Sequence, residues 1–122
     1  MRAQRSPAWL GVDVIGVLVF CVVGRRSHGE GLSVAGVATT AWPFLTGTAA
    51  GWLVSRGWRD PLAIFPTGVV VWVCTLVAGM LLRKVSSAGV AVSFVAVAAS
   101  VTAVLLLGWR GAATLLRRRR RR

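Results

Sequence analysis

Four long apolar segments, each closed by basic residues, constrain this chain more than any other feature. The segments span about residues 8–24, 34–54, 63–82 and 88–109, and each is 17 to 22 residues long. The residues that close them are, in order, Gly24-Arg25-Arg26, Ser55-Arg56, Arg83-Lys84 and Arg110. A helix of about 20 residues crosses the ~30 Å hydrocarbon core of a bilayer. Because a helix also pairs its backbone groups internally, the pattern predicts an all-α, integral membrane four-helix bundle with short loops.

The composition excludes the main alternatives to such a bundle. The chain is 56% hydrophobic with a mean hydropathy of +0.72, and it holds 15 basic residues against 3 acidic ones. Neither an ordinary soluble domain nor a disordered chain combines these values. With 122 residues there is no room for a second domain. We therefore expect a short N-terminus (1–7), a transmembrane domain (8–110) and a basic tail (111–122).

The basic residues predict an orientation. With four spans, the N-terminus, the second loop and the tail share one side, which carries eleven basic residues against four on the other side. The positive-inside rule then places both termini in the cytoplasm. The tail is expected to contact the lipid bilayer at anionic headgroups, with no specific nucleic acid as a partner. Its residues are Arg117, Arg118, Arg119, Arg120, Arg121 and Arg122.

Asp13 is the most informative single residue, because it is the one acidic residue inside an expected span. A carboxylate in that position is costly unless it faces a partner or a wet cavity. It is therefore a candidate ion or proton site in a transport pathway, or else one half of a structural ion pair. Its candidate partners are Arg56 and Arg110, which lie at span ends on the same side.

A polar loop on the opposite side holds four ionisable residues within six positions. They are Arg25, Arg26, His28 and Glu30, flanked by glycines. The loop could bind an anion through its arginines or respond to pH through its histidine, or it could simply join two helices.

Polar residues inside the spans suggest either packing or a narrow pathway. The candidates are Thr39, Trp72, Thr75 and Ser100. The second span also carries Gly47 and Gly51 in a small-xxx-small pattern, which is typical of close helix packing in lipid.

The residues needed for catalysis are missing. One His, two Asp, one Glu and two separated Cys form neither a nucleophile–base pair nor a metal motif. We expect no catalytic residue, no metal, no cofactor and no enzyme.

An ordered series of short motifs resembles an actinobacterial family of small membrane proteins catalogued as a domain of unknown function. The resemblance covers about residues 8–110. It is carried by Asp13, Val19-Phe20, Gly24-Arg25-Arg26-Ser27-His28, Ala41-Trp42-Pro43-Phe44, Gly51-Trp52, Pro66-Thr67-Gly68, Trp72, Thr75, Gly79-Met80-Leu81-Leu82-Arg83, Ser93-Phe94-Val95 and Gly108-Trp109-Arg110. It implies four transmembrane helices in a bacterial plasma membrane and supplies no activity.

Two functional hypotheses remain open at this point. The first is a small, oligomeric transporter or ion- or proton-conducting protein that uses the intramembrane carboxylate of Asp13. The second is a non-transporting scaffold or regulatory subunit of a partner membrane complex. A homo-oligomer or a membrane protein partner is expected in either case.

Overall fold

The computed structural model describes residues 8–27, 29, 31–85 and 92–121, and it is an all-α bundle of four helices, as predicted. The elements are α1 (Trp9–Ser27), α2 (Val34–Ser55), the short π-helical turn η2 (Ile64–Gly68), α3 (Val69–Val85) and α4 (Val92–Arg121). Helix α2 is capped at its start by the Ser33 hydroxyl, which accepts from the backbone N–H of Gly36. It ends where Arg56 adopts a left-handed backbone conformation.

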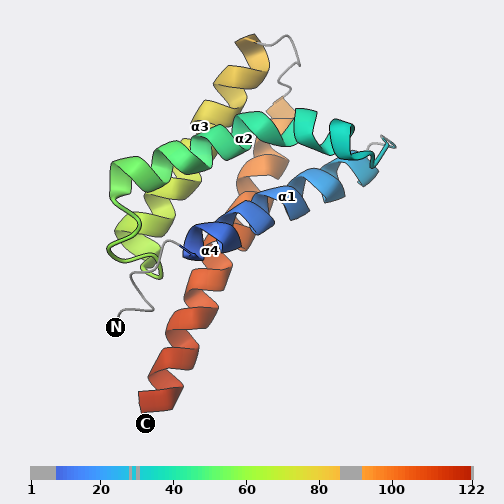
Figure 1. The fold of residues 1–122 in the computed structure, drawn as a ribbon. Helices are drawn as coiled ribbons and strands as arrows, with labels where there is room; N and C mark the ends of the chain where they lie inside the picture. Colours follow the sequence, from blue (N-terminus) through green and yellow to red (C-terminus); the bar gives the residue numbers. More distant parts are fainter. Residues whose placement is uncertain (1–7, 28, 30, 86–91, 122) are drawn as a thin grey trace.

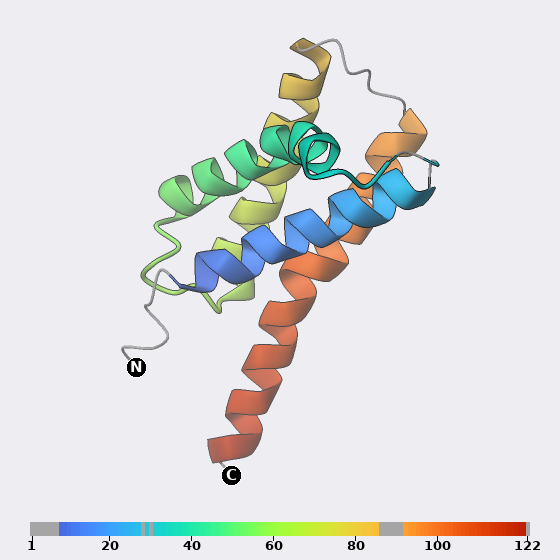
Figure 2. The same ribbon diagram turned by 45° about the vertical axis from the view of Figure 1, so that its right-hand side comes forward.

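The helices are arranged as two crossing layers rather than as a parallel stack. Helices α2 and α3 form the most extensive helix pair, and α1 contacts both α2 and α4 (Figure 1). The C-terminal part of α4 extends past the other three helices in both views (Figures 1 and 2). One end of α4 is therefore packed in the bundle, and the other stands apart from it.

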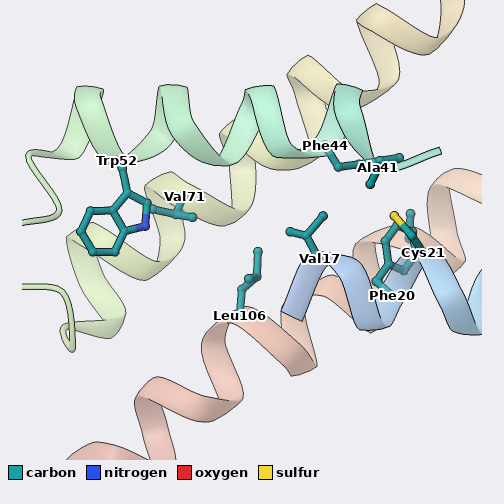
Figure 3. Packing of buried hydrophobic residues seen from close by; sticks show 9 residues of the cluster. Val17, Phe20, Cys21, Ala41, Phe44, Trp52, Val71 and Leu106 are labelled. Carbon is teal, nitrogen blue, oxygen red and sulfur yellow. The ribbon is translucent and has the colours of Figure 1, made fainter. Parts of the chain in front are cut away.

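The apolar core lies where α1, α2, α3 and α4 meet (Figure 3). Phe20 of α1 meets Phe44 of α2 edge to face, with ring centroids 5.3 Å apart. Such an arrangement contributes beyond simple area burial. The buried residues of this cluster are Val17, Phe20, Cys21, Ala41, Phe44, Trp52, Val71, Ala98 and Leu106.

Small residues bring α2 and α3 into close contact, as the small-xxx-small pattern predicted. A Cβ added to Gly51 would lie 2.7 Å from the Cα of Val71, so that this position has room for hydrogen alone. Beside it, the hydroxyls of Thr48 and Thr75 are 2.8 Å apart and bond across the interface. Helices in lipid pack through close backbone approach and through hydrogen bonds between side-chain hydroxyls.

Two stretches have the length and apolar composition needed to cross a membrane. They are Ile64–Val85 and Val95–Arg120. Helix α1 contains Asp13 and ends in Arg25 and Arg26, and α2 contains several Gly and Thr residues.

The observed helix bounds differ from the predicted ones at α3 and α4. Helix α3 begins at Val69, after η2, instead of near residue 63. Helix α4 was expected to end at Trp109, and it continues to Arg121. The residues after Gly111 are Ala, Thr, Leu and Arg, of which Ala, Leu and Arg are strong helix formers. Arginines in the last turns also interact favourably with the helix dipole.

Candidate functional site

The site centres on Asp13, whose side chain is fully buried near the start of α1. Its carboxylate forms a bidentate ion pair with Arg110 of α4. Arg110 Nη1 donates to Oδ1 over 2.8 Å, and Nη2 donates to Oδ2 over 2.7 Å. Both side chains have no exposed surface. Two parallel N–H···O bonds between a guanidinium and a carboxylate form a strong charge-assisted pair.

Two tryptophans complete the shell around the carboxylate. The indole N–H of Trp52 in α2 donates to Oδ2 over 2.7 Å, and that of Trp109 in α4 donates to Oδ1 over 2.9 Å. Each carboxylate oxygen of Asp13 therefore accepts one bond from an indole and one from the guanidinium. Three helices converge on one side chain.

Arg110 is held from further directions by backbone carbonyls. Its Nε donates to the carbonyl of Pro61 over 2.9 Å, and its Nη1 also donates to the carbonyl of Leu106 over 2.9 Å. Four of the guanidinium's five N–H groups are thus paired. Because Pro61 lies between α2 and η2, the same cluster also fixes that connection. We call Asp13, Trp52, Trp109, Arg110 and the Pro61 carbonyl the polar latch.

Aromatic rings cover the outer side of the polar latch. Trp9 stacks on Trp109 with ring centroids 5.5 Å apart and an interplanar angle of 12°. The guanidinium carbon of Arg110 lies 4.6 Å from the centroid of the Trp109 ring, within the range of a cation–π contact. The charged pair is therefore enclosed by low-dielectric material, where its attraction is strong.

Two glycines provide the space that the latch needs. A Cβ at Gly68 would lie 2.9 Å from the Cδ of Arg110, and a Cβ at Gly57 would lie 2.7 Å from the Trp52 ring. The turn that follows α2 and the end of η2 can therefore pack directly on the buried side chains.

Of the two candidate partners for Asp13, the structure brings Arg110 to the carboxylate. Arg56 instead lies exposed at the end of α2. The backbone N–H of Arg56 bonds to carbonyls of the last turn and closes that helix.

The polar loop is only partly described, because His28 and Glu30 lie outside the described residues. Arg25 donates through Nε to the carbonyl of Gly31 over 2.6 Å and through Nη1 to the hydroxyl of Thr40 over 2.9 Å. Arg26 is exposed, and its carbonyl accepts from the N–H of Gly29. Arg25 therefore ties the end of α1 to the first turns of α2.

The four candidate pathway residues are not brought together. Thr39 and Ser100 are exposed, and each hydroxyl bonds to the carbonyl four residues earlier in its own helix. Thr75 is buried between α2 and α3. The indole N–H of Trp72 bonds to α4 through the hydroxyl of Thr102 and the carbonyl of Ala99, each over 3.2 Å. Trp72 and Thr75 thus serve helix contacts.

Sequence reasoning missed the roles of Trp52, Trp109 and Pro61. The hydrogen bonds of both tryptophans to Asp13 depend on how the helices are rotated, which the sequence does not record. Among the described residues, no cluster of three or more His, Cys, Asp or Glu is placed to hold a metal ion.

The chain belongs to the family described as protein of unknown function DUF3054, whose model matches residues 10–113. The matched region contains every residue of the polar latch and ends before the arginine tail. No curated protein and no solved structure matches the chain.

Proposed function

We propose that this protein is a four-span plasma membrane protein with both termini in the cytoplasm, and that it acts as a non-transporting scaffold or regulatory subunit. It has no enzymatic activity in this proposal. The two highly apolar helical stretches support a membrane location. The uneven distribution of basic residues supports the orientation.

The single observation that supports the non-transporting role is that the hydrogen bonds and the charge of the Asp13 carboxylate are already satisfied within the fold. Its carboxylate accepts four hydrogen bonds, its charge is paired with that of Arg110, and it has no exposed surface. A carboxylate that couples transport must exchange partners with an ion or proton. In this structure the partners of Asp13 are held by two other helices, α2 and α4, which suits a structural role.

Transport through Asp13 would require Arg110 to leave the carboxylate. Separating a buried pair of this kind costs about 3–5 kcal/mol unless new partners replace the old ones. The guanidinium would also lose its bonds to Pro61 and Leu106. The transport hypothesis therefore needs a second conformation in which α1 and α4 have separated.

Proton flux into proteoliposomes separates the two hypotheses. We expect wild type, Asp13→Asn and the matched control Asp60→Asn, whose carboxylate is exposed, to give the same flux as empty vesicles. Chemical crosslinking in native membranes should then recover a membrane protein partner. Flux in wild type and Asp60→Asn that is lost in a folded Asp13→Asn variant would establish transport instead.

The orientation is tested with single cysteines in a background lacking Cys21 and Cys74. A membrane-impermeant maleimide added to intact cells should label Arg26→Cys and leave Arg59→Cys unlabelled until the cells are broken. Labelling of Arg59→Cys in intact cells would reverse the orientation.

A further inference from the structure

The C-terminal part of α4 is a continuous helix that holds a run of positively charged residues. Residues 111–121 continue the same helix that packs in the bundle, and they extend beyond the other helices (Figure 2). Arg118, Arg119 and Arg120 are exposed, and Arg117 is half-buried. Because successive residues of a helix are rotated by about 100°, four consecutive arginines surround the helix axis on all sides. They form a ring of charge, which we call the arginine ring (Arg117–Arg120).

The chain offers few acidic residues that could neutralise this ring. The sequence holds three acids, at positions 13, 30 and 60, and none lies beyond residue 60. The carboxylate of Asp13 is already occupied by Arg110. The ion pair recorded within the described part of the chain is that one, and it does not involve the ring. Among the described residues the ring has no acidic partner, so its charge is available to anions from outside the chain.

The residues just before the ring indicate which anions these are. Leu115 and Leu116 are 58% and 59% exposed, so an apolar surface immediately precedes the charges. Along the helix axis, the ring begins about 10 Å beyond Arg110 and ends about 15 Å beyond it. The interfacial zone of a bilayer is roughly 5–7 Å deep on each side. Long arginine side chains can reach back over that distance with their stems on apolar surface.

We propose that the arginine ring is a binding site for the phosphates of anionic phospholipids in the leaflet that α4 enters, with Leu115 and Leu116 inserted among the headgroups. This inference rests on the proposed membrane location and adds the lipid class and the residues that select it. The site lies outside residues 10–113, so it is a feature that family membership does not supply.

Lipid selectivity of the full chain, reconstituted in mixed phosphatidylcholine and phosphatidylglycerol vesicles, tests the proposal. The measurement is the fraction of motionally restricted lipid seen by electron spin resonance with each spin-labelled lipid. Neutralising one arginine near an anionic surface weakens the interaction by up to about fivefold. We expect the triple change Arg118→Gln, Arg119→Gln and Arg120→Gln to lower the preference for phosphatidylglycerol at least twofold, and the matching Lys changes to retain it.

The control neutralises exposed arginines elsewhere on the same predicted side. Arg56→Gln with Arg59→Gln should lower the preference by clearly less than the triple Gln change. Equal loss in this control, or an unchanged preference in the triple Gln variant, would overturn the proposal. Alkaline carbonate extraction separates this failure from a failure of the proposed function. A chain released by carbonate is not an integral membrane protein, whereas a retained chain without lipid preference refutes the arginine ring alone.

Discussion

Replacing one charged member of the polar latch, either Asp13 or Arg110, is expected to destabilise the fold strongly. In Asp13→Asn the guanidinium of Arg110 stays buried without its counter-charge, and in Arg110→Met the carboxylate keeps two indole donors alone. Both partners are fully buried and are 2.7–2.8 Å apart in the native pair. Removing one member of a buried pair typically costs about 3–5 kcal/mol, so each single variant should lose about that much unfolding free energy.

The double variant distinguishes an ion pair from two separate packing effects. Asp13→Asn combined with Arg110→Met leaves no buried charge in the latch. It should therefore be less destabilised than the sum of the single variants, by about 2–3 kcal/mol. The assay is reversible unfolding by SDS in mixed micelles, followed by far-ultraviolet circular dichroism. Tryptophan fluorescence is unsuitable as the primary signal because Trp52 and Trp109 contact Asp13 directly.

A matched pair of exposed residues serves as the control. Asp60→Asn and Arg56→Met change charge outside the latch and should shift the unfolding free energy by no more than about 0.5 kcal/mol. Single latch variants that unfold like wild type, or effects that add within about 0.5 kcal/mol, would refute the assignment of the latch as a coupled ion pair.

Two further predictions use the same unfolding assay. Trp52→Phe removes a donor to the buried carboxylate of Asp13 and should cost about 1.5–3 kcal/mol, whereas Trp58→Phe changes an exposed ring and should be neutral. An equal effect of the two changes would contradict a specific role for the Trp52 indole. Gly51→Ala places a Cβ against the α3 backbone and should cost about 1–3 kcal/mol. In Gly108→Ala the new Cβ faces open space, so the change should be neutral or stabilise by up to about 1 kcal/mol. A greater loss of unfolding free energy in Gly108→Ala than in Gly51→Ala would refute the α2–α3 packing described above.

The sequence was sufficient to predict the helices and to single out Asp13. The lengths of the apolar segments predict four helices, because each segment is long and is separated from the next by charged or glycine-rich residues. Asp13 stands out because an acid inside an apolar run needs a partner. Arg110 followed as a candidate from its comparable depth at a span end. These inferences depend only on where apolar and charged residues lie along the chain, which the sequence shows directly.

The remaining contacts depend on how the helices rotate and cross, which no pattern in one segment records. Arg56 and Arg110 both end apolar segments, and hydropathy alone does not distinguish them. The left-handed turn at Arg56 directs its side chain to the surface, whereas Arg110 lies on the face of α4 that meets α1. The predicted end of the fourth helix was wrong for a related reason. Arg110 was interpreted as a terminal charge, but it is buried within a helix that continues for eleven more residues.

The burial of Arg110 also bears on the proposed orientation. A neutralised arginine inside the fold cannot act as an exposed charge at the membrane surface, so it should be removed from the count of topological signals. Ten basic residues then remain on that side against four on the other. Moreover, the latch joins the start of α1, the connection after α2 and the end of the packed part of α4. The three segments therefore lie together in the fold, which agrees with the grouping used in the proposed orientation.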